Sequence, residues 1–239
     1  MAAALAWGAL SASSLLVGAL LGVRRRWPER QVGAVLAFGA GALISAVSFE
    51  LLEEGAQVGG PGWVALGLGT GAIVYYAADG VVARGGHGKA ARFSPAGAGP
   101  ALALGAFLDG IPEQAVLGIG LASGEGVSVG LVVAIFVSNL PEAIGSASEM
   151  REGGQEARVI LRLWTAVAVI CALATVVGYA IADAASGDLR AGIDGFAAGA
   201  LLVMLVDSMI PEATGKYGRK AGLVTTLGFA LAAGLSSVS

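Results

Sequence analysis

The sequence contains two stretches with a shared pattern, Phe107-Leu-Asp-Gly-Ile-Pro-Glu113 and Phe136-Val-Ser-Asn-Leu-Pro-Glu142. Both lie inside long apolar runs, and each places a glutamate directly after a proline. Proline cannot donate a backbone hydrogen bond, so each one frees a carbonyl group one turn earlier and kinks a helix beside its carboxylate. A carboxylate near the bilayer centre costs about 2.5–3.5 kcal/mol. These groups therefore have to face a polar interior, and this requirement decides how the surrounding helices are arranged.

The rest of the chain is apolar enough to lie in a membrane. Of its 239 residues 56% are hydrophobic and 13% are charged, and the mean hydropathy is +0.80, whereas soluble domains carry about 25% charged residues. The net charge of −3 offers no basic surface for nucleic acid. A single cysteine excludes a disulfide framework. No Lys or Arg precedes the first apolar run, so we expect it to be a retained helix and not a signal peptide.

Charged and Gly/Pro-rich breaks divide the chain into apolar segments of membrane-spanning length. We expect an all-α membrane protein with eight transmembrane helices in a single domain, residues 1–239. The polar, glycine-rich segment 84–99 is expected to be the longest loop. The expected helices lie near 2–22, 32–52, 62–83, 100–122, 127–149, 159–182, 192–213 and 221–238.

The basic residues fall on alternate connections between these segments. Thirteen of the 14 Lys and Arg residues lie on one side of the expected bundle, and only Arg190 lies on the other. Cytoplasmic loops carry the Lys and Arg excess, so both termini are expected to be extracytoplasmic and the 84–99 loop cytoplasmic. The expected location is the inner cell membrane, as a multi-pass protein.

Two pairs of segments align without gaps. The two Pro-Glu stretches align with each other, and Phe38-Gly-Ala-Gly-Ala-Leu43 aligns with Phe196-Ala-Ala-Gly-Ala-Leu201. Carried forward, the second alignment pairs Glu54 with Glu212. The members of each pair are expected to run through the bilayer in opposite directions. This pattern predicts inverted-topology repeats.

The central carboxylates favour a divalent cation. Asp109 and Glu113 share one helix face, and Ser138 or Asn139 with Glu142 repeats that arrangement on the next helix. Carboxylates brought together repel each other unless they are protonated or neutralised, and a divalent cation neutralises them while accepting oxygen ligands. Two alternatives stay open: the groups are protonated and hydrogen-bonded as packing contacts between helices, or they form a proton relay.

Other candidate residues are weaker. Glu50 and Glu54 end the second expected helix near the outer surface, and Asp207 and Glu212 end the seventh near the inner surface. They suit entrance and exit ligands, although helix-end carboxylates are often simply solvated. We treat Cys171 as an apolar filler unless it faces the carboxylates.

On these residues the sequence resembles the ZIP family of divalent-metal transporters over nearly its whole length. The two kinked helices of that family typically read His-Asn-x-Pro-Glu-Gly or a near variant, and here they read Asp109-Gly-Ile-Pro-Glu-Gln114 and Ser138-Asn-Leu-Pro-Glu-Ala143. The resemblance implies eight spans, exterior termini and a central binuclear-type site that is filled from outside and emptied into the cytoplasm. It also places Ser138 where the family has a histidine, so Ser138 joins the expected ligands.

The sequence resembles a divergent, histidine-poor, bacterial-type member of this family, because its site residues depart from the family pattern. Both motif histidines are absent, Gly110 replaces the first asparagine, and the sixth helix lacks the Glu or Gln that often completes the second site. Imidazole suits Zn²⁺, whereas carboxylate and carbonyl oxygens suit Mn²⁺, Mg²⁺ or Ca²⁺. We therefore expect harder cations such as Mn²⁺ to compete with Zn²⁺ better than in histidine-containing relatives.

The sequence thus predicts a transporter, not an enzyme, that moves zinc, manganese, iron or a similar divalent cation into the cytoplasm through a carboxylate-lined intramembrane site. The expected partners are the metal ion and membrane lipid, without nucleic acid or a cofactor; a homodimer stays open. The alternatives are a proton-coupled small-solute carrier and a transport-inactive metal-binding relative. An intramembrane protease is disfavoured, because Asp79 and Asp109 lack the Gly-x-Gly-Asp context and the single histidine, His87, lies in an expected loop.

Overall fold

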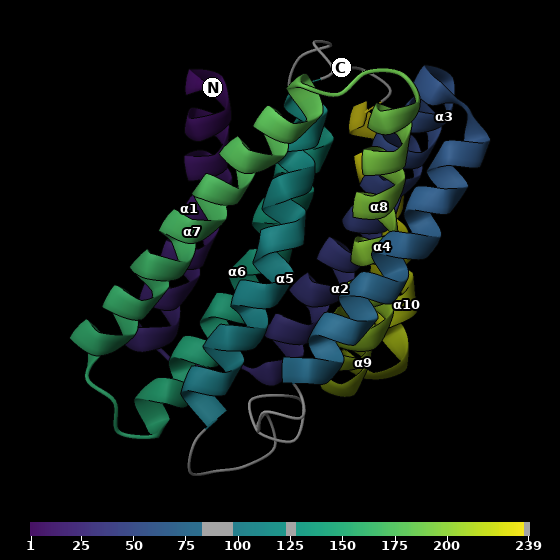
Figure 1. Ribbon diagram of the computed structural model, residues 1–239. Helices are drawn as coiled ribbons and strands as arrows, with labels where there is room; N and C mark the ends of the chain where they lie inside the picture. The colour runs from purple at the N-terminus through teal and green to yellow at the C-terminus, as the bar shows by residue number, and fades with distance from the viewer. Residues whose placement is uncertain (83–97, 123–127, 237–239) are drawn as a thin grey trace.

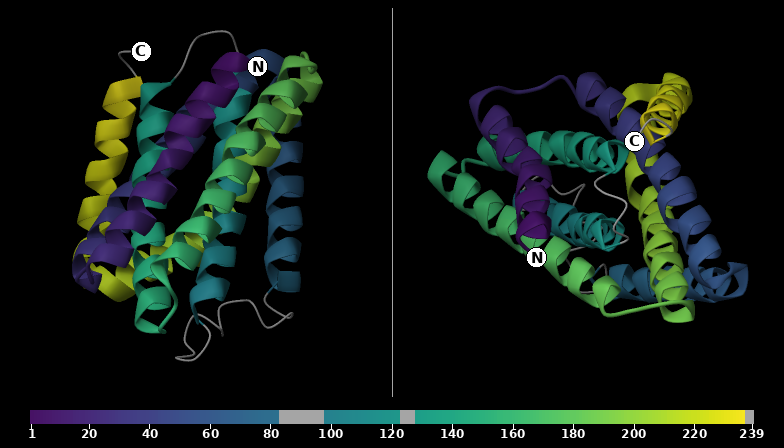
Figure 2. Two further views of the ribbon diagram at one scale, coloured as in Figure 1. Left: turned by 90° about the vertical axis from the view of Figure 1, so that its left-hand side faces the viewer. Right: turned by 90° about the horizontal axis from the view of Figure 1, so that it is seen from above.

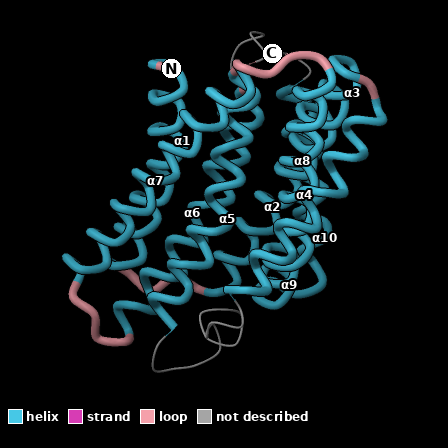
Figure 3. Tube along the Cα trace, in the orientation of Figure 1, coloured by secondary structure: helices cyan, strands magenta, loops and turns pink. Residues whose placement is uncertain are grey.

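The structure is a computed structural model that describes residues 1–82, 98–122 and 128–236. All secondary structure in these residues is helical (Figure 1, Figure 3). In chain order the helices are α1 (Ala2–Arg24), α2 (Glu29–Ala46), the π-helical η1 (Val47–Glu53), α3 (Glu54–Gly59), α4 (Pro61–Val82), α5 (Ala98–Leu121), α6 (Val129–Glu152), α7 (Ala157–Asp183), α8 (Asp188–Met204), the π-helical η4 (Leu205–Met209), α9 (Ile210–Tyr217), the short 3₁₀ helix η5 (Gly218–Lys220) and α10 (Ala221–Ser236).

Several helices are long and apolar enough to cross a membrane. The last qualifying stretch contains a turn at Gly218, whose φ of 76° suits glycine, and α10 then runs back along the bundle (Figure 1). The expected class, an all-α membrane protein, agrees with this architecture. Within the described residues six stretches qualify: Ala2–Arg24, Glu29–Gly59, Pro61–Val81, Val129–Glu152, Ala157–Asp183 and Asp188–Ser236.

The helices form two packed groups. In one group α1 packs on α6 and α7, and α5 packs on the same two helices. In the other, α4 packs on α8 and α10 packs on α2. The two groups are joined mainly where α2 lies against α6, as the view along the bundle makes clear (Figure 2). Leu36, Ile135 and Leu201 belong to the core at this junction.

Helix backbones approach closely where glycine replaces a side chain. A Cβ on Gly41 of α2 would lie 1.8 Å from the carbonyl oxygen of Thr225 in α10. A Cβ on Gly199 of α8 would lie 2.1 Å from the carbonyl oxygen of Leu68 in α4. Any side chain at these positions would push the helices apart. Small residues are a common means of tight helix packing in lipid, where the hydrophobic effect does not drive helices together.

Two π-helical turns were not expected from the sequence. A π turn widens the helix and is frequent at functional sites. The helix expected at 32–52 begins at Glu29 and continues through η1 and α3 to Gly59. The helix expected at 192–213 begins at Asp188 and continues through η4 into α9.

Most of the expected 84–99 loop, including His87, lies outside the described residues, and only residues 98 and 99 of it are described. There the structure differs from the expectation, because α5 already begins at Ala98. The helix can start at this point because the Gly-Pro pair that follows lies in its first turn, where proline is tolerated.

Candidate functional site

The helices that carry the Pro-Glu motifs, α5 and α6, lie side by side and run in opposite directions (Figure 1). Four of the expected site residues meet between them. Asp109 and Glu113 of α5 are only 5% and 2% exposed, and Ser138 and Asn139 of α6 are 0% and 1% exposed. The two motifs therefore form one buried polar cluster inside an apolar bundle.

The Glu113 carboxylate is held by two donors from the opposite helix. The Ser138 hydroxyl donates to Glu113 Oε2 at 3.1 Å, and the Asn139 amide donates to the same oxygen at 2.6 Å. Asn139 also donates to the carbonyl oxygen of Ile135 at 2.9 Å. The amide group of Asn139 thus donates to two acceptors, while its Oδ1 is buried and has no hydrogen-bond partner among the described residues.

Asp109 is held by two residues that the sequence did not suggest. The Tyr75 hydroxyl of α4 donates to Asp109 Oδ1 at 2.6 Å, and the Ser208 hydroxyl of η4 donates to Oδ2 at 3.1 Å. One signal for Ser208 was present, since the Phe38–Phe196 alignment pairs it with Glu50. Nothing in the apolar sequence around Tyr75 marked that residue.

Glu142, the remaining central carboxylate, is partly buried on α6. Glu142 and Glu113 both lie close enough to Cys171 of α7 to interact with it electrostatically. Cys171 thus lies within electrostatic range of both carboxylates, and its Sγ lies 3.0 Å from the position that a Cβ on Gly110 of α5 would occupy. Among the described residues, however, no three Asp, Glu, His or Cys side chains converge closely enough to hold a metal ion as they stand. A cation would need oxygen atoms from Ser138 or Asn139, or a side-chain rotation, to complete its ligands.

The neighbouring helices fit tightly around this cluster. A Cβ on Gly39 of α2 would lie 2.9 Å from the Ser138 Cα, so glycine lets α2 approach α6 at the site. On the other side, Gln114 of α5 donates to the Ser11 hydroxyl of α1 at 3.1 Å and accepts from the Thr175 hydroxyl of α7 at 2.8 Å. These contacts fix α5 against α1 and α7 and give the buried side chains of Ser11, Gln114 and Thr175 hydrogen-bond partners.

The weaker candidates have their own partners. Glu50 of η1 accepts from the hydroxyl groups of Ser128 and Ser236, which lie at the start of α6 and at the end of α10. Glu212 of α9 pairs with Lys216 at 2.7 Å. Asp207 of η4 is partly buried. Glu50 and Glu212 thus have partners outside the cluster of Asp109 and Glu113, whereas Asp207 directly precedes Ser208, which donates to Asp109.

Glu54 belongs to a buried ionic group near the start of α8. Arg190 is 7% exposed and pairs with Asp194, which is 1% exposed, at 3.0 Å. Glu54 lies 3.9 Å from Arg190. The guanidinium also donates to the carbonyl oxygen of Ile119 in α5 at 2.7 Å, so it links the two helix groups.

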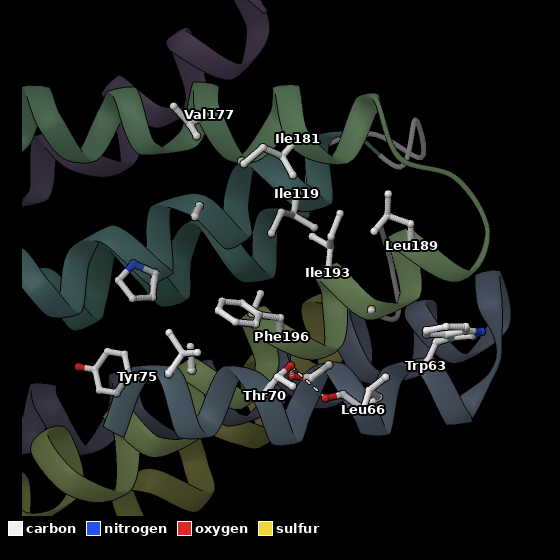
Figure 4. A pocket seen from close by; sticks show the side chains of 18 of the residues that line it. Trp63, Leu66, Thr70, Tyr75, Ile119, Val177, Ile181, Leu189, Ile193 and Phe196 are labelled. Atoms are coloured by element: carbon white, nitrogen blue, oxygen red, sulfur yellow. Dashed lines mark hydrogen bonds between the residues drawn. The ribbon is translucent and has the colours of Figure 1, made fainter. Parts of the chain in front are cut away.

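An apolar cavity of about 690 Å³ lies beside the site, between α4, α5, α7 and α8 (Figure 4). Trp63, Ile181 and Phe196 are among its lining residues. Tyr75 and Pro112 also line it. Tyr75 therefore contributes its ring to the cavity wall and its hydroxyl to Asp109.

Comparison with known proteins gives one informative similarity. No protein-family profile matches the sequence. The chain is 28% identical, over 181 residues, to an Arabidopsis thaliana protein described as a "putative zinc transporter". The similarity covers 73% of this chain and 29% of that protein, so the chain spans less than a third of its relative's length. It supports a relationship to metal transporters.

Proposed function

We propose that this protein carries a divalent metal cation across the membrane into the cytoplasm, through the site between α5 and α6, in a ZIP-like helix bundle. The observation that carries the proposal is the convergence of Asp109 and Glu113 with Ser138 and Asn139 in a buried cluster of a membrane-length bundle. A bound dication would offset the cost of holding carboxylates in this setting. The description of the plant relative points to the same kind of substrate.

The proposal includes eight membrane crossings. In the part of the chain that the structure describes, six stretches have the required length and composition. The crossing by α5 adds a seventh, and division of Asp188–Ser236 at Gly218 adds the eighth. An even number of crossings is supported by the start of α1 and the end of α10, which lie at the same end of the bundle (Figure 2).

Both termini are proposed to be extracytoplasmic. Basic residues gather at the opposite end of the bundle, where α1 meets α2 and α6 meets α7 (Figure 1). Arg26 and Glu152 pair there at 3.0 Å. In a Cys171→Ser background, a Glu156→Cys variant should react with an impermeant thiol reagent only after the cells are permeabilised. Labelling of this variant in intact cells would contradict the proposed orientation and indicate the opposite one.

Inverted repeats are supported by matching backbone features. The alignment that begins at Phe38 and Phe196 pairs Val47 with Leu205, the two residues at which η1 and η4 begin. The close helix contacts match as well. Gly41 meets a carbonyl of α10 and Gly199, its aligned partner, meets a carbonyl of α4.

The reverse contacts follow the same rule. A Cβ on Gly228 of α10 would lie 2.1 Å from the Phe38 carbonyl oxygen, and a Cβ on Gly71 of α4 would lie 2.0 Å from that of Phe196. The pair α2 and α10 is thus packed like the pair α8 and α4. Such repeats place the substrate site at their interface, near the bilayer midplane.

Glu113 and Glu142 are proposed to bridge the cation, because they occupy equivalent positions after the two prolines. Asp109 and Asn139 would supply further oxygen ligands, and Ser138 would supply a neutral one. Glu50, Glu54, Asp207 and Glu212 are kept only as entrance or exit ligands. The experiment that tests the function is uptake of Mn²⁺, Zn²⁺, Fe²⁺, Co²⁺ and Cd²⁺ into proteoliposomes. Uptake of at least one cation is expected, and silence for all five would contradict transport and favour a solute carrier or an inactive relative.

A further inference from the structure

Cys171 lies where the two Pro-Glu helices face α7. It is fully buried, and its Sγ lies 3.0 Å from the position that a Cβ on Gly110 would occupy. The Asn139 Oδ1 lies 3.5 Å from that same position. The thiol of α7 and the amide oxygen of α6 thus flank one point on α5 at which glycine leaves no side chain.

The Asn139 oxygen supplies a second and independent sign of a ligand. It is buried and has no hydrogen-bond partner within the described part of the chain, and its residue is only 1% exposed. Nearly all buried polar atoms in proteins have a partner, because an unpaired one destabilises the fold. A water molecule or a cation bound beside Gly110 would satisfy this oxygen. Glu113 and Glu142 lie close enough to Cys171 for their negative charge to act on the same place.

We propose that Cys171 is a metal ligand, which acts with Asn139 Oδ1 and the Glu113 and Glu142 carboxylates and makes the substrate a thiophilic divalent cation such as Zn²⁺ or Cd²⁺. This assignment rests on the metal transport proposed above. Soft thiolate ligands select Zn²⁺ and similar cations, whereas sites with only carboxylate and carbonyl oxygens favour Mg²⁺, Ca²⁺ or Mn²⁺. The thiol proton is released when the metal binds, since thiolate is the ligating form.

The proposed ligands have to converge when a cation binds, since no three Asp, Glu, His or Cys side chains of the described residues lie close enough together to hold one. Zinc–sulfur bonds are about 2.3 Å and zinc–oxygen bonds about 2.0–2.2 Å. One cation bound to both atoms therefore requires the Cys171 Sγ and the Asn139 Oδ1 to lie within about 4.5 Å of each other, and both atoms lie beside Gly110. The inference also revises the selectivity expected from the sequence. The missing histidines favour harder cations, but a thiol in the site shifts the preference back toward softer ones.

The competing interpretation is that Cys171 fills space as a small apolar residue. It belongs to the same core cluster as Leu15, Ala147 and Trp164, which lie on α1, α6 and α7. Burial alone does not distinguish the two roles, since free cysteine is often buried. A ligand and a filler differ in what a serine does, because serine keeps the size but removes the soft sulfur.

The test compares Zn²⁺, Cd²⁺ and Mn²⁺ binding to the purified parent and to Cys171→Ser, with a thermal melt of each protein. Zn²⁺ and Cd²⁺ affinity should fall roughly tenfold or more in Cys171→Ser, while Mn²⁺ affinity stays within about twofold. Cd²⁺ should produce a thiolate-to-metal charge-transfer absorption in the parent that Cys171→Ser lacks. Restoring a thiol on the same helix but at a half-exposed position, by Leu173→Cys in the Cys171→Ser background, should not restore the absorption.

A Gly110→Ala variant provides a second test that keeps the thiol. Its methyl group would lie 3.0 Å from the Cys171 Sγ and 3.5 Å from the Asn139 Oδ1, where it keeps a shared cation away from both atoms, so the Cd²⁺ absorption should disappear although Cys171 remains. The ligand role of Cys171 would be overturned if each of the three metals bound the parent and Cys171→Ser with the same affinity and the parent showed no Cd²⁺ charge-transfer absorption. A Glu142→Gln variant distinguishes failure of this inference from failure of the proposed function. It should lower the affinity for all three metals whether or not Cys171 is a ligand. Unchanged affinity in this variant would overturn the proposed function itself.

Discussion

Glu113 and Glu142 hold the same place in two matching motifs, yet their surroundings differ. Glu113 is 2% exposed and receives hydrogen bonds from Ser138 and Asn139, whereas Glu142 is only partly buried. By the motif alignment, the residues of α5 that match this pair are Asp109 and Gly110.

The difference follows from those two positions. An ionised aspartate accepts hydrogen bonds but cannot donate them, and glycine has no side chain. Helix α6 can therefore hold Glu113, but α5 cannot hold Glu142 with the corresponding residues. The duplicated motif thus gives one carboxylate, Glu113, that the matching residues of the neighbouring helix hold, and a second, Glu142, that the matching residues of α5 do not hold. The following variants test this division of roles.

The largest effect is expected for Glu113→Gln and Glu142→Gln. Each change keeps the volume of the side chain but removes a charge that balances a dication, so metal affinity should fall on the order of 100-fold, or about 2.8 kcal/mol. Equilibrium binding to purified protein measures the loss, and thermal melts verify folding. Glu53→Gln, at an exposed position, is the matched control and should bind as the parent does.

Asp109→Asn should have a smaller effect, on the order of tenfold in affinity. The amide removes one charge but keeps a carbonyl oxygen, which can still accept the hydrogen bond from Tyr75. The same binding measurement applies, with Tyr75→Phe as the control for a lost hydrogen bond. An Asp109→Asn loss as great as that of Glu142→Gln would place Asp109, and not the Pro-Glu pair, at the centre of the site.

Asn139→Ala should weaken binding about fivefold, the equivalent of about 1 kcal/mol. Water can replace a neutral oxygen ligand, and Glu113 keeps the Ser138 donor. The comparison predicts that this variant makes Glu113 resemble Glu142, so the affinity cost of Glu113→Gln should change when both substitutions are combined. Strict additivity in this double-mutant cycle would show that Asn139 does not position Glu113.

Ser208→Ala should have the smallest effect, about twofold in affinity, because Asp109 keeps its shorter hydrogen bond from Tyr75. Binding titrations of parent and variant, run side by side, resolve a change of this size. A tenfold loss would mean that Ser208 itself contacts the ion.

The cluster between α5 and α6 could be predicted because its residue types are unusual in a membrane-spanning helix. Carboxylates and prolines in an apolar run have few explanations, and helical spacing places Asp109 and Glu113 on one face. The all-helical membrane class followed from composition alone. A 239-residue chain with so few charged residues is typical of a protein that lies in a membrane.

The residues around the cluster could not be predicted in the same way. Tyr75 reaches Asp109 only because Gly67 and Gly71 let α4 lie against α8, a long-range contact without a local pattern. Arg190 looked like one residue of an outer connection, but it is buried with Asp194 inside the bundle. The π turns η1 and η4 depend on packing rather than on residue type, so the sequence offered no sign of either.

The central claim, that Glu113 and Glu142 bridge a cation between α5 and α6, is tested most directly by anomalous scattering from crystals grown with Cd²⁺. The account predicts a peak at about 2.0–2.6 Å from oxygen atoms of both carboxylates. Peaks confined to Glu50 or Glu212, with both central carboxylates still hydrogen-bonded to protein groups alone, would contradict it.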